Sequence, residues 1–423
     1  MVRMAENRTT AHLAANQATA HPATSQATVT GTRIMAIRVP PGGNDRLGCY
    51  ALNHPALPFG AHAAVLRSLA GRNLLFSEMQ QAVYELDDLG AYVWRCRHAG
   101  LSPEQIVREL ADAGVDFDDA AEVVGAGLGR LVPIQGTNVP AHPSVRPAPA
   151  TRLTCLSIMI AGVAVQLHLS RPLLDDVQAA FGHLETDVPE SDVQLCARLV
   201  GGRVEFHPPG QQAWSCELPE FVPLLKAQLI EDVLRNACYE IALHAAAFAC
   251  RDRVLLLVGS PGAGKTTLGI ALMQTGFEFV ADDVVLLDEE GFTAGLPFPP
   301  AIKSGSWPLI ARHWPSLATG RTYRRPDGQR VRYLVPDPIA AAHLRRIGFV
   351  ILLDRRDQAG TCVEDIDPAV ALAALISEGT ARDRRLSVAG FNSLVGTLNE
   401  ARCRRLTFRD LPEAADALRA LCS

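Results

Sequence analysis

The stretch of this chain best suited to chemistry is a glycine-rich segment between an apolar run and a helical pattern. The apolar run covers 254–258, breaks at Gly259, and gives way to a helical pattern from Thr266 onward. The segment that joins the apolar run to the helical pattern, including the first residues of the helix, is Gly259-Ser260-Pro261-Gly262-Ala263-Gly264-Lys265-Thr266-Thr267. It contains the full phosphate-loop motif, G-x-x-x-x-G-K-[ST], with the strand and helix that the motif requires. A glycine-rich turn without a ligand is the alternative, and this context counts against it.

The motif predicts ATP and Mg²⁺ as cofactors. Backbone N–H groups within 259–267, Pro261 excepted, would surround the phosphate oxygens, and the start of the helix adds positive potential. The ammonium of Lys265 would reach the β- and γ-phosphates, and the hydroxyl of Thr266 would ligate Mg²⁺.

Lysine is rare in this chain. Of 40 basic residues only Lys226, Lys265 and Lys303 are lysines. Because lysine is a compact point charge and arginine a planar fork, a lysine retained against this bias indicates a special requirement. For Lys265 this requirement is contact with phosphate in the motif. Lys303 is a candidate contact to phosphate or substrate, with a solvent-facing lysine as the alternative. Lys226 lies in an amphipathic helical pattern and is predicted on a solvated face.

Two adjacent acids follow the loop helix. The segment from Phe279 is predicted as one strand that contains Asp282 and Asp283. Such a pair between apolar residues is unfavourable unless a metal, a proton-transfer role or cations hold it. Asp282 is one helix and one turn beyond Lys265, so its strand is predicted beside the phosphate-loop strand, with both carboxylates near the γ-phosphate and Mg²⁺. Two acids facing solvent at a strand end are the alternative.

A histidine precedes the loop on another predicted strand. Apart from Glu240 and His244, residues 240–249 are apolar, and the turn 251–253 joins them to the phosphate-loop strand. Two strands joined by so short a turn are antiparallel neighbours. His244 is therefore a candidate site residue, and a histidine satisfied within the core is the alternative.

Composition limits the classes of protein. With 423 residues, 48% apolar residues and a net charge of −5, the chain is predicted to form two or three ordinary globular domains. The lack of net basicity disfavours nucleic acid as a partner. No apolar run is long enough for a membrane span, and the first 32 residues lack the apolar core of a signal peptide. The ten cysteines show no metal-binding spacing and are predicted as thiols of a cytoplasmic protein.

The chain divides into four predicted segments: a disordered tail over 1–40, a small domain over 41–132, a proline-rich linker over 133–150 and a large domain over 151–423. In the small domain, a helix over 61–69 should precede two strands within 73–86, and then helices capped by Asp87 and Ser102 and a third over 117–131. In the large domain we expect strands within 153–169, helices over 172–184 and 218–236, a hairpin within 193–206, a buried strand over 349–353, and helices over 367–376 and 411–422. The arginine-rich segment 321–356 adds Arg332, on a predicted strand, as a candidate nucleotide contact, with solvated arginines as the alternative.

The segment from His244 to Asp283 resembles the HPr kinase/phosphorylase family and its related kinases. That family shares a phosphate-loop fold with phosphoenolpyruvate carboxykinases and phosphorylates a serine hydroxyl of a protein. The resemblance implies that Asp282 is the base for the incoming hydroxyl, while His244 and Asp283 orient it and help to hold the metal. The segment from Leu296 to Lys303 is similar to a proline-then-lysine segment of the related kinases. The arginine signature of true HPr kinases is missing after the acid pair, so neither HPr recognition nor the reverse reaction is expected.

The segment 73–132 resembles the PqqD family, through Leu86 to Trp94 and Ser102 to Leu110. The resemblance implies a winged-helix-like fold that captures the leader segment of a ribosomally made peptide as an added strand. A winged helix with only a structural role is the alternative.

These observations predict an α/β protein in which an HPr-kinase/PEP-carboxykinase-like phosphate-loop domain follows a small winged-helix α+β domain. The predicted activity is ATP-dependent phosphorylation of a serine or threonine hydroxyl on a peptide or small protein held by the small domain. A non-catalytic ATP-binding regulatory module and a small-molecule kinase of the same fold are the alternatives. The oligomeric state stays open, a homo-oligomer included.

Overall fold

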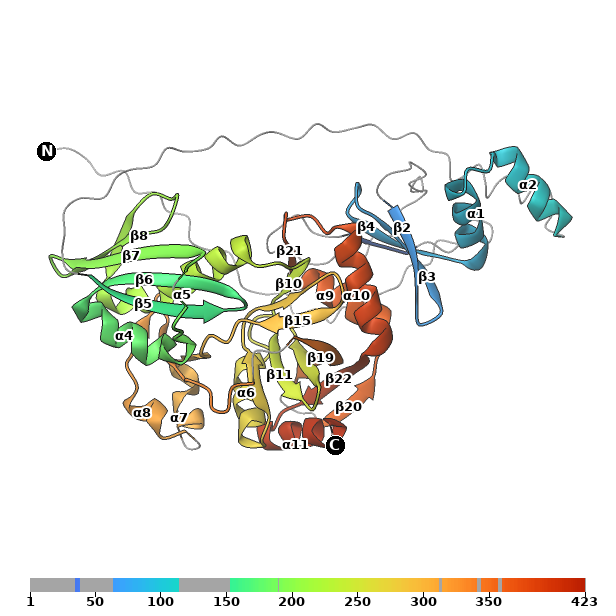
Figure 1. Cartoon of the computed structure of the whole chain (residues 1–423). Helices are drawn as coiled ribbons and strands as arrows, with labels where there is room; N and C mark the ends of the chain where they lie inside the picture. Colours follow the sequence, from blue (N-terminus) through green and yellow to red (C-terminus); the bar gives the residue numbers. More distant parts are fainter. Residues whose placement is uncertain are drawn as a thin grey trace, which may run out of the picture.

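The computed structural model describes residues 35–38, 64–113, 153–188, 190–311, 314–340, 344–356 and 360–422. It is a mixed α/β protein with several sheets (Figure 1). The predicted tail, linker and helix over 117–131 lie outside the described residues, apart from one short strand within the tail.

The N-terminal unit is a four-stranded antiparallel sheet followed by two helices. Its elements are β1 (Met35–Arg38), β2 (Ala64–Leu69), β3 (Arg72–Ser77), β4 (Ala82–Leu86), α1 (Asp88–His98) and α2 (Pro103–Asp112), with strand order β1-β4-β3-β2. Asp87 caps α1 and Ser102 forms a capping box with Gln105, which confirms both predicted helix starts. The winged-helix interpretation stays a prediction.

The helix predicted over 61–69 is wrong, because most of this segment is β2. Ala70 and Gly71 both have positive φ, 49° and 78°, which is the backbone of a two-residue hairpin turn. The turn pairs β2 with β3 as antiparallel strands. Leu69 lies opposite Arg72 at one end of the pairing, and Ala64 lies opposite Ser77 at the other. Strand pairing outweighs the weak local preference for helix.

The N-terminal sheet packs on a helix from the other end of the chain, α10 (Val388–Glu400), as Figure 1 shows. Phe76 and Phe391 are both fully buried, and their rings stack with centroids 4.8 Å apart. The side chain of Gln81 accepts a hydrogen bond from the backbone N–H of Leu386 at 2.8 Å and donates one to its carbonyl at 3.0 Å. The small unit is therefore fixed to the large one by apolar and polar contacts.

A five-stranded sheet with two helices begins the large domain. Its elements are β5 (Leu153–Ile160), β6 (Val163–Ser170), α4 (Arg171–Phe181), β7 (Val193–Val200), β8 (Arg203–His207), β9 (Trp214–Glu217) and α5 (Leu218–Asn236). The strand order is β5-β6-β7-β8-β9. The predicted strands around 161–162, the hairpin at 201–202 and the helix over 218–236 are all confirmed.

A ten-stranded sheet carries the phosphate-loop motif. Its strands are β10 (Ile241–Leu243), β11 (Ala246–Cys250), β12 (Arg253–Val258), β13 (Glu278–Ala281), β14 (Val285–Leu287), β15 (Phe292–Gly295), β19 (Arg345–Arg355), β20 (Cys362–Asp365), β21 (Gly379–Ala381) and β22 (Arg402–Phe408). The main order is β13-β11-β12-β19-β15-β14-β10-β21, and β22 joins β19 to β20. β11 is antiparallel to β12, as predicted, whereas β12, β19 and β22 are parallel.

The remaining elements flank these sheets. They are α6 (Lys265–Gln274), β16 (Ala301–Lys303), α7 (Trp307–Ile310), α8 (Ser316–Thr319), β17 (Tyr323–Arg324), β18 (Arg330–Tyr333), α9 (Pro368–Ser377) and α11 (Leu411–Cys422). The predicted strand over 349–353 and the two C-terminal helices are confirmed, although within 349–353 only Val350 and Ile351 are fully buried. Among the described helices, none combines the length and apolar character needed to cross a membrane.

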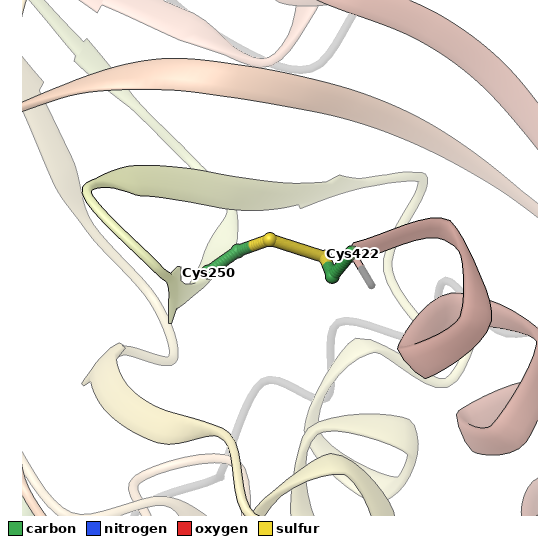
Figure 2. Close-up of a disulfide and its surroundings, with 2 residues drawn as sticks. All are labelled: Cys250 and Cys422. Atoms are coloured by element: carbon green, nitrogen blue, oxygen red, sulfur yellow. A yellow bond between two sulfur atoms is a disulfide. The ribbon is translucent and has the colours of Figure 1, made fainter.

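A disulfide joins the end of β11 to the last helix. Figure 2 shows the bond between Cys250 and Cys422, which are 172 residues apart in the sequence. The prediction that all cysteines are thiols is therefore wrong for this pair, because folding brings two residues of distant elements together. The bond fastens α11, whose residues Ala414 and Leu418 are buried in the same cluster as Leu268 of α6.

Candidate functional site

The phosphate loop joins the carboxyl end of β12 to the start of α6. Gly262 and Gly264 have φ of 91° and 97°, a region that residues with a side chain rarely adopt, and Gly264 caps the helix. Lys265 is 8% exposed, its ammonium donates a hydrogen bond to the carbonyl of Gly259, and burial lowers its pKa. The loop thus combines free helix N–H groups with one buried cation, which suits phosphate.

Asp282 reaches this loop from a strand that is not adjacent to β12. The predicted neighbour position is wrong, because the hairpin partner β11 lies between β12 and β13. The prediction that both acids lie within one strand is also wrong, since β13 ends at Ala281 and β14 starts at Val285. Two successive antiparallel pairings nevertheless return the carboxyl end of β13 to the edge of the sheet where β12 ends.

The Asp282 carboxylate lies against the first turn of α6. It is 5% exposed, and its Oδ2 accepts a hydrogen bond from the Thr266 hydroxyl at 3.0 Å. Burial, with the nearby charge of Asp283 as the second cause, raises the pKa of Asp282 to about 7. A carboxyl group buried at the start of a phosphate-loop helix and titrating near neutrality is suited to proton transfer.

Asp283 is held by Lys226, for which the helical pattern predicts a solvated position. The Lys226 ammonium on α5 lies 2.5 Å from Asp283 Oδ2, and Lys226 is only 6% exposed, so its predicted solvated position is wrong. The rings of Phe298 and Tyr333 each have centroids 5.9 Å from this ammonium. Burial pushes the pKa of Asp283 upward, but the charge and hydrogen bond of Lys226 outweigh it, so the pKa lies below its ordinary value.

The rarity of lysine was the sequence signal for this contact. Two of the three lysines in the chain, Lys226 and Lys265, lie at the site. Helical periodicity could not reveal this, because the surface that covers Lys226 comes from segments 57 and more residues away in the sequence.

His244 lies in the break between β10 and β11, next to the acid pair. It is exposed, which rules out the core alternative. Its Nδ1 lies 3.0 Å from the carbonyl oxygen of Asp283, and because a carbonyl only accepts, Nδ1 carries the proton. Its backbone N–H donates to the carbonyl of Glu378 at 2.7 Å. The imidazole thus contacts the acid pair through the backbone of Asp283.

For Lys303 and Arg332, contact with a nucleotide stays a prediction. Lys303 ends the short strand β16 and is exposed. Arg332 donates to the carbonyls of Leu317 and Ala318 at 2.7 and 2.8 Å, and its guanidinium lies 4.0 Å from the centroid of the Trp307 ring. These contacts join Arg332 to the segment that contains α7 and α8.

The oxygen donors at the loop fit a magnesium ion. Neighbouring ligands of octahedral Mg²⁺, with bonds of about 2.1 Å, lie about 3 Å apart, which matches the 3.0 Å between Thr266 Oγ1 and Asp282 Oδ2. No group of three or more histidine, cysteine, aspartate or glutamate residues suited to a metal occurs in the described parts of the chain. A site completed by phosphate oxygens is typical of Mg²⁺. Asp283 as a metal ligand stays a prediction, with its carboxylate paired to Lys226.

Comparison with known proteins finds a likeness among solved structures. No protein-family model matches the chain, and no curated protein matches it. Among solved structures, the HPr(Ser) kinase/phosphatase from Coxiella burnetii is similar, with 14% sequence identity and a TM-score of 0.21. The match covers 43% of this chain and 96% of that protein. At this identity and TM-score it supports no argument about activity.

Proposed function

We propose that this protein is an ATP-dependent kinase that phosphorylates a serine or threonine hydroxyl of a peptide or small protein. The observation that carries the proposal is the buried Asp282 carboxylate, 3.0 Å from the Thr266 hydroxyl at the first turn after the phosphate loop. A nucleotide held by this loop would present its terminal phosphate to that carboxylate.

Each residue of the site would have a separate role in phosphoryl transfer. Such transfer depends on positioning, on charge neutralisation and on a base for the nucleophile rather than on covalent catalysis. The N–H groups of the loop and the Lys265 ammonium would hold the β- and γ-phosphates. Asp282 would accept the proton of the attacking hydroxyl as the new phosphorus–oxygen bond forms and ADP leaves. Magnesium, held by Thr266 and Asp282, would neutralise charge on the phosphates.

Lys226 and His244 would position the acid pair. The ion pair with Lys226 satisfies the Asp283 carboxylate, so that Asp282 is the member left to exchange a proton. The hydrogen bond from His244 to the Asp283 carbonyl fixes the backbone of the segment between β13 and β14.

The peptide part of this proposal rests on the N-terminal unit. Its sheet accepts an extended segment of the same chain, β1, as an added antiparallel strand beside β4. Edge addition of this kind is a common mode of peptide recognition. The contacts of Gln81 and Phe76 with the segment around α10 fix this unit against the catalytic sheet. A peptide bound to the N-terminal unit would present its hydroxyl to Asp282 at a high effective concentration.

The test is transfer from γ-labelled ATP with Mg²⁺ to pools of serine- and threonine-containing peptides, with alanine-substituted pools as the control. We expect labelled peptide and a mass gain of one phosphoryl group, both abolished in Asp282→Asn and Lys265→Ala. Asp416→Asn is the matched control, because this carboxylate lies on α11, is 61% exposed and pairs with Arg419. Release of free phosphate with every pool would contradict the proposal. A regulatory ATP sensor would lose its function in Lys265→Ala and keep it in Asp282→Asn.

A further inference from the structure

Three parallel strands end at the edge of the sheet where the phosphate loop lies. β12 continues into the loop, β19 ends at Arg355, and β22 ends at Phe408, which is opposite Arg355 in the register. β19 runs three residues beyond Leu352, the partner of the last residue of β12. Arg355 is thereby carried out to the level of the loop.

Arg355 and Phe408 lie beside the glycine that caps α6. A Cβ atom built on Gly264 would lie 3.7 Å from Cζ of Phe408 and 3.9 Å from Cδ of Arg355. Phe408 is fully buried and forms a fixed wall. Arg355 is exposed, and within the described residues its guanidinium makes no hydrogen bond or ion pair. The next residue, Arg356, is bound to Asp354 at 2.7 Å.

The two sides of the loop differ in charge. The acid pair and His244 reach the loop from the side of β11 and β13, whereas Arg355 reaches it from β19 on the opposite side of β12. A nucleotide across the loop therefore has one end near a carboxylate and the other near an unpaired cation. The proposed transfer to a hydroxyl beside Asp282 requires the terminal phosphate at the acid side.

We propose that Arg355 stacks on the base of the bound nucleotide. The nucleotide then lies across the loop with its terminal phosphate toward Asp282 and its base toward β19. A guanidinium suits this position, because it is planar, weakly hydrated and stacks on aromatic faces, which a lysine ammonium does less well. This inference rests on nucleotide binding by the loop, which is part of the proposed function.

The test compares ligands that have and lack a base. Affinities for ATP, CTP and inorganic tripolyphosphate, each with Mg²⁺, are measured by calorimetry on the full chain and on Arg355→Ala, Arg355→Lys and Arg356→Ala. Arg355→Ala should weaken ATP binding about tenfold, as expected for loss of one stacked cation. It should leave tripolyphosphate binding unchanged and reduce the preference for ATP over CTP. Arg355→Lys should recover only part of the loss, and Arg356→Ala should bind all three as the unmodified chain does.

Each other outcome overturns the inference. Equal weakening of ATP and tripolyphosphate would make Arg355 a phosphate contact, and unchanged ATP affinity would remove it from the site. Failure of the proposed function gives a different result, since the unmodified chain and Lys265→Ala would then bind ATP equally poorly.

Discussion

The pair of Lys226 and Asp283 gives a sharp test of the site's electrostatics, because either partner can be neutralised without much change in shape. The two charged groups are 2.5 Å apart, and their side chains are 8% and 39% exposed. Lys226→Met removes the ammonium and leaves the carboxylate without its partner. Asp283→Asn removes the opposite charge. The double variant removes both charges and the ion pair together.

The magnitude follows from the burial of the pair. Removing one partner of a fully buried ion pair costs about 3–5 kcal/mol, and the partial exposure of Asp283 reduces this to about 2 kcal/mol. For a protein of this size that lowers the thermal midpoint by about 2–3 °C. The double variant should lie closer to the unmodified protein than Lys226→Met does, because no uncompensated charge remains.

Thermal unfolding followed by circular dichroism at pH 7.5 measures the stability of the unmodified chain, the two single variants and the double variant. Lys303→Met is the matched control and should change the free energy of unfolding by less than about 0.5 kcal/mol, as exposed substitutions usually do. Additive effects of Lys226→Met and Asp283→Asn would show that the two residues do not interact. That result would refute the assignment of Lys226 to the site.

Three further predictions concern the fold and the titration of the site. Cys422→Ser should lower the free energy of unfolding by about 2–4 kcal/mol. Adding a reductant should lower the thermal midpoint of the unmodified chain by a similar amount, and it should leave the thermal midpoint of Cys422→Ser unchanged. Phe391→Ala should cost about 3–5 kcal/mol and speed proteolysis within 64–113, whereas Val370→Ala, at an exposed position, should do neither. Because the pKa of Asp282 is raised from 3.8 to about 7, the folded state binds the extra proton and its stability falls as pH rises through this interval. Asp282→Asn should therefore raise the thermal midpoint more at pH 8 than at pH 5, and an equal gain at both would contradict the raised pKa.

The sequence predicted the local features of the site well. The phosphate loop follows from residue types whose backbone conformation and charge allow few alternatives, and the helix starts at Asp87 and Ser102 follow from capping chemistry. The antiparallel hairpin before the loop follows from a turn too short for a crossover.

Contacts between distant segments could not be predicted in this way. The position of β13 beyond β11 depends on which edge the chain pairs with after α6, and both edges are compatible with the same apolar pattern. The burial of Lys226 depends on Phe298 and Tyr333, which lie far along the sequence. Arg355 could not be distinguished from its eight neighbouring arginines until the register of β19 placed it beside Gly264.

The central claim is that Asp282 faces the terminal phosphate of a nucleotide held by the loop. A crystal structure with Mg²⁺ and a non-hydrolysable ATP analogue measures this directly. We predict the γ-phosphate between Lys265 and Asp282, with open space beside the carboxylate for an alcohol. A nucleotide that binds with its base at Asp282, or a terminal phosphate that lies on the β19 side of the loop, would contradict the account.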